Sequence, residues 1–255
     1  MIPELTTEQW IYGMIAAVFV GLGKGGLPGA GNLAIIFMAM AFPSKVSVGI
    51  LLPVLIFADV VAVIIYSQHA RWKHLVKLLP WTLVGVMGGT WVLREIDDQF
   101  LTRLIGFILL TMVLLRWVSK KMGKDSDEKE ADDRKSTTGR IWVPFTGIMG
   151  GVATMVANAA GPVVGIYLLI SGLPKYALIG TAAWFFFIIN LCKLPFQVAI
   201  GNLSWGSLKI SIAFGMMAAI ATSVAPRIVK YIPEKTFVIL IWAFIIVAGL
   251  KMILF

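Results

Sequence analysis

The sequence predicts an all-α polytopic membrane protein made of two inverted-topology repeats. Three observations predict this class. The 255 residues are 59% hydrophobic and 14% charged, whereas soluble domains carry about 25% charged residues. Apolar runs of span length recur along the chain, and each can cross a hydrocarbon core of about 30 Å. Two long stretches interrupted by glycine divide these runs into two sets of three.

The predicted spans are helices, because their apolar residues run on without the alternation that strands would show. The first set covers 46–67, 74–93 and 99–118, and the second covers 176–200, 206–226 and 235–254. Mean hydropathy over the chain is +0.90, which agrees with several crossings.

A glycine-broken segment precedes each set, at residues 11–42 and 141–172. A continuous helix over the second segment would be about 50 Å long, well beyond the thickness of the bilayer core. Gly150, Gly151, Gly161 and Pro162 lie near its middle. We expect each segment to break into two short helices, either as a re-entrant hairpin or as two half-helices of one crossing.

The two halves also resemble each other weakly in sequence. "FPSKVSVG" (42–49) aligns with "LPKYALIG" (173–180), and Asp59 and Asn190 each follow ten residues later. The alternative is chance similarity between apolar helices. A duplication predicts an N-terminal membrane repeat at 1–118, a charged linker at 119–140 and a C-terminal membrane repeat at 141–255.

Basic residues predict the orientation. Arg71, Lys73 and Lys77 lie in one loop, and many Lys and Arg residues lie between 116 and 140. Two spans separate these loops, so they share a side, which the positive-inside rule makes the cytoplasm. The third basic loop, 227–235, lies on this same side only if each broken segment enters and leaves the membrane on one side. Both termini then lie outside and the second repeat is inverted, as in many secondary transporters.

Enzyme and nucleotide sites are not predicted. His69 and His74 lie at the first basic loop, Cys192 is alone, and the spans hold one acid, Asp59. These residues do not form a metal site, a catalytic triad or a carboxylate pair, and no cofactor is expected. The G-x-G-x-x-G letters between 21 and 26 lack the strand and the later acid of a dinucleotide site. The net charge of +9 is assigned to cytoplasmic loops rather than to nucleic-acid binding.

Two lysines and the helix breaks predict an anion site. A broken helix end exposes N–H groups that bind anions, and an ionisable side chain inside a membrane is costly unless it faces a cavity or a partner. The predicted substrate-binding residues are Gly23, Lys24, Gly25, Gly26, Asn32, Asn158, Gly161, Lys193 and Gln197. Asp59 and Asn190 are the predicted coupling or counter-ion residues. Glycines that only pack helices, a Lys24 side chain that reaches the interface, and a structural ion pair at Asp59 stay open as alternatives.

Two glycine motifs and two helix starts carry a resemblance to a known family. "GLGKGGLPGAGNL" (21–33), "GIMGGVATMVANAAGP" (147–162) and the two aligned helix starts are similar to those of the TauE/SafE sulfite exporter family. Lys24 stands where members often have adjacent glycines. The resemblance implies a multi-pass protein of the bacterial inner membrane that exports sulfite or organosulfonates.

Together these observations predict a secondary transporter of a small sulfur oxyanion that works by alternating access at the broken helices. An anion channel with the same site is one alternative, and a membrane scaffold or enzyme subunit is another. The expected partners are the anion and the lipid bilayer, without nucleic acid. Whether the chain forms a homodimer stays open.

Overall fold

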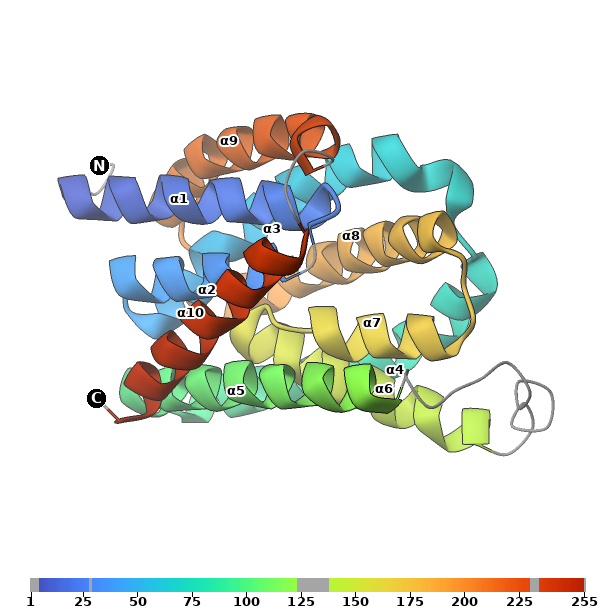
Figure 1. The fold of residues 1–255 in the computed structure, drawn as a ribbon. Helices are drawn as coiled ribbons and strands as arrows, with labels where there is room; N and C mark the ends of the chain where they lie inside the picture. Colours follow the sequence, from blue (N-terminus) through green and yellow to red (C-terminus); the bar gives the residue numbers. More distant parts are fainter. Residues whose placement is uncertain (1–4, 28, 123–137, 230–233, 255) are drawn as a thin grey trace.

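The computed structural model describes residues 5–27, 29–122, 138–229 and 234–254, and over these residues it is a bundle of helices without strands (Figure 1). In the first half these are α1 (Thr7–Lys24), α2 (Ala30–Ala41), α3 (Ser44–Tyr66), the short η1 (Ser67–His69), α4 (Trp72–Glu95) and α5 (Asp98–Met122). In the second half they are α6 (Thr138–Ala157), α7 (Gly161–Ile170), α8 (Lys175–Ala199), α9 (Trp205–Val229) and α10 (Glu234–Leu254).

Four of the predicted spans are confirmed as apolar helices of membrane length. They are Ser44–His69, Trp72–Glu95, Tyr176–Ala199 and Trp205–Ile228. Large apolar side chains project outward from them, among them Ile64 at 73% exposed and Trp91 at 68%. An apolar exterior of this kind suits lipid rather than water. The predictions at 99–118 and 235–254 fall on helices α5 and α10, and their crossing of the membrane stays a prediction.

The predicted linker at 119–140 is partly helical. Helix α5 runs on to Met122, and α6 begins at Thr138. Residues 123–137 lie outside the described part of the chain.

Helices α1 and α2 form an antiparallel pair. Near the start of α1, Gln9 Nε2 donates a hydrogen bond to the carbonyl oxygen of Ala41, at the end of α2 (3.1 Å). Near the other end, a Cβ built on Gly23 would lie 2.7 Å from the backbone nitrogen of Gly31. Between the helices, Gly26 and Gly29 have φ angles of 114° and 86°. These angles favour glycine, because other L-residues are strained there.

The second break lies between α6 and α7. Asn158 has a φ of 54°, the left-handed conformation that asparagine tolerates better than most residues. Gly150, on α6, faces Val163 and Val164 of α7, so α7 folds back beside the helix that precedes it. Helix α6 continues past Gly151 to Ala157, whereas α1 ends at Lys24, before Gly25.

Two close seams of small residues hold these segments in the bundle. Gly21 on α1 and Gly25 at its C-cap lie against Ala221 and Ala225 of α9. On α6, Gly147 lies against Trp81 of α4, and Gly151 against the carbonyl oxygen of Thr82. The four-residue spacing in each seam is the small-xxx-small pattern of close helix packing in membranes.

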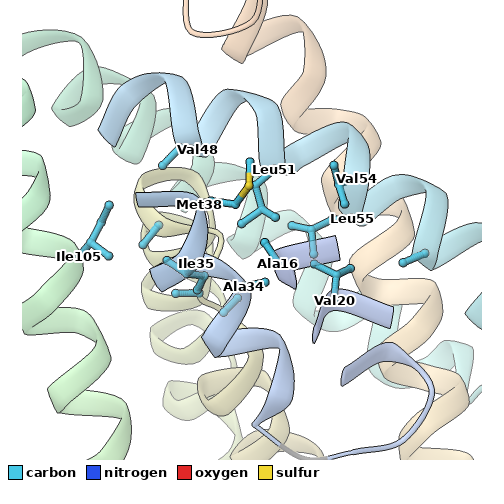
Figure 2. Packing of buried hydrophobic residues seen from close by; sticks show 14 of the residues in the cluster. Ala16, Val20, Ala34, Ile35, Met38, Val48, Leu51, Val54, Leu55 and Ile105 are labelled. Carbon is cyan, nitrogen blue, oxygen red and sulfur yellow. The ribbon is translucent and has the colours of Figure 1, made fainter. Parts of the chain in front are cut away.

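Helix α3 lies at the centre of the bundle and packs against α1, α2, α8 and α9. Its Val48, Leu51 and Val54 side chains meet Ala16 and Met38 from the α1–α2 pair (Figure 2). The second central helix, α8, lies against α3. Polar residues on these two helices therefore sit deep inside the protein.

Candidate functional site

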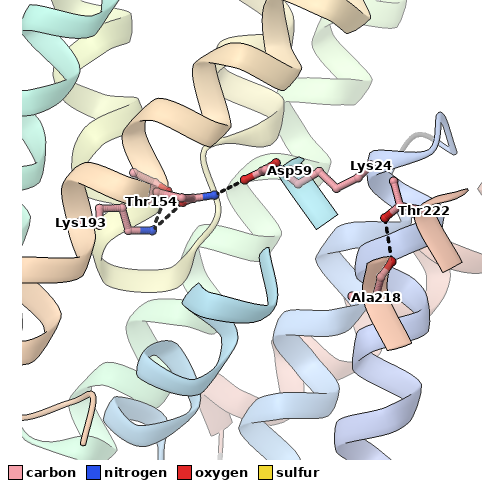
Figure 3. A network of polar contacts seen from close by, with 7 residues as sticks. Lys24, Asp59, Thr154, Lys193, Ala218 and Thr222 are labelled. Carbon is pink, nitrogen blue, oxygen red and sulfur yellow. Dashed lines mark hydrogen bonds and ion pairs between the residues drawn. The ribbon is translucent and has the colours of Figure 1, made fainter. Parts of the chain in front are cut away.

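Six polar residues form a connected cluster in the centre of the bundle, which we call the polar cluster. It consists of Lys24 (α1), Asp59 (α3), Thr154 (α6), Asn158 (after α6), and Asn190 and Lys193 (α8). Figure 3 shows Lys193 and Thr154 at one side and Lys24 at the other, with Asp59 between them.

An ion pair forms the first part of the cluster. Lys24 Nζ lies 2.6 Å from Asp59 Oδ1; the Lys24 side chain is 16% exposed, and that of Asp59 is fully buried. The ammonium group also lies over the ring of Phe186, 4.2 Å from its centroid, in the arrangement of a cation–π contact. Lys24 is in the last turn of α1, where the helix dipole favours a cation.

Asn190 continues the cluster from the other carboxylate oxygen. Its Nδ2 donates a hydrogen bond to Asp59 Oδ2 at 2.7 Å. Its Oδ1 accepts one from Lys193 Nζ at 3.3 Å. The two neighbours together fix the orientation of the amide, because a carboxylate accepts only and an ammonium donates only.

Lys193 is buried without a carboxylate partner. Its side chain is 0% exposed. Besides Asn190, it donates to Thr154 Oγ1 at 3.1 Å and to Asn158 Oδ1 at 2.6 Å. The three hydrogen bonds match the three donors of an ammonium group. All three acceptors are neutral, and among the described residues no ion pair involves Lys193.

Asn158 attaches the second helix break to the central helix. While its Oδ1 accepts from Lys193, its Nδ2 donates to the carbonyl oxygen of Val48 at 3.0 Å. The cluster therefore runs without interruption from the end of α1 to the end of α6. With both lysines and Asp59 ionised, two positive charges and one negative charge give it a net charge of +1.

The predicted glycines shape the first break. The carbonyl oxygen of Gly25 accepts a hydrogen bond from the Tyr66 hydroxyl at 3.2 Å. Gly23 allows α1 to approach α2, and Gly26 supplies a positive φ angle. They hold Lys24 in position through the backbone.

Three predicted residues are not joined to the cluster by the described contacts. Gln197 lies one turn beyond Lys193, but its amide bonds to the carbonyl oxygen of Met155 (3.3 Å) and to Asn202 (3.0 Å). Asn32 is buried in α2, and its backbone N–H donates to Gly29. Gly161 has open space where a side chain would lie.

Three residues at the site were not predicted from the sequence: Thr154, Phe186 and Tyr66. Thr154 precedes Asn158 by four residues, a spacing that puts two residues on one helix face, so this signal was present. Tertiary packing alone brings Phe186 to Lys24 and the Tyr66 hydroxyl to the Gly25 carbonyl oxygen.

Among known proteins, the chain matches the model of one family and no individual curated protein or solved structure. The family model described as "Sulfite exporter TauE/SafE" matches residues 13–252. The match covers nearly the whole chain, including both helix breaks and every member of the polar cluster, so this protein belongs to the TauE/SafE sulfite exporter family.

Proposed function

We propose that the chain is a secondary transporter that exports a small sulfur oxyanion, sulfite or an organosulfonate, across the bacterial inner membrane. The observation that supports it best is Lys193, a fully buried ammonium group held by neutral oxygens. It belongs to a cluster whose formal charge is +1.

A buried cation with no counter-ion is expensive for the fold. Moving an ammonium group out of water costs several kcal/mol even after relaxation, and hydrogen bonds to neutral oxygens recover only part of this. An anion beside Lys193 would supply the missing charge. Sulfonate and sulfite oxygens would accept hydrogen bonds from the Lys193 ammonium and from the Asn158 amide.

The cluster joins two segments that are suited to movement. Lys24 lies at the end of α1, and Thr154 and Asn158 lie at the end of α6, next to the two breaks. Around the second break, added side chains at Gly161 and Gly165 would meet no atom within 4 Å. The first turn of α7 carries backbone N–H groups that would add to anion binding there.

Matching contacts in the two halves support an inverted repeat. Gly21 and Gly25 pair with α9 as Gly147 and Gly151 pair with α4. In these seams Thr222 donates to Ala218 (2.8 Å), and Thr82 donates to Leu78 (3.0 Å).

The starts of α3 and α8 also correspond. Gly49 packs on Asn202 in the α8–α9 connection, and Gly180 packs on Tyr66 at the end of α3. The aligned Asp59 and Asn190 bond to each other, as expected for residues near a two-fold axis. Such repeats change access to a central site by rocking against each other.

The same geometry supports the proposed topology. Because α1 and α2 are antiparallel, the first segment enters and leaves on one side. The α3–α4 connection, the end of α5 and the end of α9 lie at one end of the bundle, and the start of α1 and the end of α10 lie at the other (Figure 1). These are the three basic loops of the sequence, so this end is proposed to be cytoplasmic.

Counterflow in proteoliposomes tests the function. Vesicles loaded with unlabelled sulfite should accumulate labelled sulfite transiently against its gradient, because a carrier exchanges its substrate across the membrane. Lys193→Met should abolish this accumulation. The matched control is Lys209→Met, which changes an exposed lysine on α9 and should leave exchange intact. Uptake that only follows the gradient would identify a channel, and the absence of any sulfite flux would contradict transport.

A further inference from the structure

We propose that the polar cluster selects its substrate by charge and accepts a monoanion, hydrogen sulfite or an organosulfonate, in preference to a dianion such as sulfate. Asp59 sets this selectivity. The inference rests on the proposed function and specifies the substrate of the same site.

Lys24 already has its negative partner in Asp59. Both oxygens of Asp59 are engaged, Oδ1 by Lys24 at 2.6 Å and Oδ2 by Asn190 at 2.7 Å. Lys24 has a second favourable contact in the ring of Phe186. Its charge is therefore balanced before any substrate binds.

The charge of Lys193 is not balanced in this way. Its partners Thr154, Asn158 and Asn190 are neutral. The charged groups that face one another in the cluster are Lys24 from α1, Asp59 from α3 and Lys193 from α8. The helix α6 contributes only neutral groups to it. One positive charge remains for a substrate.

A substrate whose charge does not match that of the cluster binds at a cost. A monoanion beside Lys193 brings the net charge of the cluster and substrate together to zero. A dianion leaves one negative charge beside Asp59, Thr154, Asn190 and Lys193, which are all buried, and buried net charge is strongly unfavourable. Of the three partners of Lys193, Asn158 is the least buried, so it is the one that would give up its hydrogen bond to Lys193 for a substrate oxygen.

Asp59 therefore acts as a specificity-determining residue without contacting the substrate. Replacing it by neutral asparagine would raise the cluster charge to +2, which suits a dianion. Removing the Lys24 charge as well would return the cluster to +1. The charge on the cluster, rather than either residue alone, then predicts which anion is preferred.

Calorimetric titration of the purified full-length protein in detergent tests this. The probes are methanesulfonate, a monoanion, and sulfate, a dianion, and the proteins are the wild type, Asp59→Asn and Lys24→Gln/Asp59→Asn. The wild type should prefer methanesulfonate. In Asp59→Asn the preference should fall by about tenfold or more, the size expected for one nearby unit charge in a partly desolvated site. The double variant should recover the wild-type preference.

A further variant reports on the same charge without removing Asp59. Asn190→Asp adds a negative charge at nearly constant shape and brings the cluster to zero, so methanesulfonate affinity should fall about tenfold or more. This result would support the inference even if Asp59→Asn did not fold, as judged by size-exclusion elution.

Three outcomes would overturn charge selection and leave transport standing. The first is a wild-type protein that binds sulfate as tightly as methanesulfonate. The second is a preference that stays within about threefold of wild type in Asp59→Asn. The third is an Asn190→Asp protein that binds methanesulfonate normally. If the folded wild type binds neither these two anions nor sulfite, the proposed function itself fails.

Discussion

Lys24→Met is expected to destabilise the protein considerably more than Asp59→Asn, although both substitutions break the same ion pair. The asymmetry follows from burial. Lys24 is 16% exposed and Asp59 is fully buried. Without Lys24, the carboxylate keeps only the Asn190 amide as a direct partner. Without the Asp59 charge, Lys24 keeps some water and the Phe186 ring.

The magnitudes follow from the cost of an uncompensated buried charge. Removing one partner of a buried ion pair costs about 3–5 kcal/mol, which applies to Lys24→Met because the remaining group is Asp59. Asp59→Asn leaves the charge on Lys24, which is partly exposed, while Lys193 keeps its three hydrogen bonds, so it should cost less, about 1–2 kcal/mol. In Lys24→Met/Asp59→Asn the unpaired carboxylate of residue 59 has gone, so the double variant should be more stable than Lys24→Met. The coupling energy should be about 2–3 kcal/mol.

Reversible unfolding in mixed micelles, followed by circular dichroism, measures these free energies. Lys209→Met serves as the control for removal of a lysine at an exposed position and should change the free energy of unfolding by about 0.5 kcal/mol or less. Equal losses in the two single variants, or strictly additive losses in the double variant, would refute the reasoning.

Three further predictions concern the parts that hold the site, all measured by the same unfolding assay unless stated. Gly151→Ala should cost about 1–3 kcal/mol, because its Cβ would collide with the Thr82 carbonyl oxygen. Gly161→Ala should be nearly neutral, because its Cβ would meet no atom within 4 Å. Equal losses of stability in the two variants would contradict the packing role of Gly151. Asn158→Ala should cost about 2–4 kcal/mol through the lost contacts to Lys193 and Val48. Asn158→Gly should cost about 1 kcal/mol less, because glycine tolerates the φ of 54°; the reverse order would contradict this reading of the break. Tyr66→Phe should speed amide hydrogen exchange at residues 25–27 by removing the 3.2 Å hydrogen bond to Gly25, and unchanged exchange would show that this bond does not hold the turn.

The membrane helices could be predicted from composition because an apolar run of span length has few other uses. Predicted spans 46–67 and 74–93 correspond to α3 with η1 and to α4 within a few residues. The helices start earlier than the apolar runs where polar residues form the first turn, as Ser44 and Lys45 do in α3. Hydropathy marks the part of a helix in lipid and not where its hydrogen bonding begins.

The path of α1 through its glycines was harder to predict. The helix continues past Gly21 and Gly23 and ends at Lys24, because contact with α9 compensates for the low helix propensity of glycine. The sequence shows that such residues are small, but it does not show which helix they face.

For the site, the sequence indicated the residue types and left their partners open. Lys24, Lys193 and Asp59 were identifiable because charge inside an apolar span is costly. That Asp59 pairs directly with Lys24 and reaches Lys193 only through Asn190 is a property of the packing of α1, α3 and α8. Gln197 was selected for its nearness to Lys193 in sequence, yet one further helix turn carries it to the α8–α9 connection, where it bonds to Asn202.

A structure of the wild-type protein with a bromine-substituted alkanesulfonate would test most directly whether the polar cluster binds the anion. Anomalous scattering from the bromine locates the ligand independently of any assumption about the site. The prediction is a sulfonate with an oxygen about 3 Å from Lys193 Nζ, beside Asn158, while Lys24 and Asp59 remain paired. A sulfonate bound only at the basic loops, or none in a crystal that holds the intact cluster at saturating ligand, would contradict the claim that this cluster is the transport site.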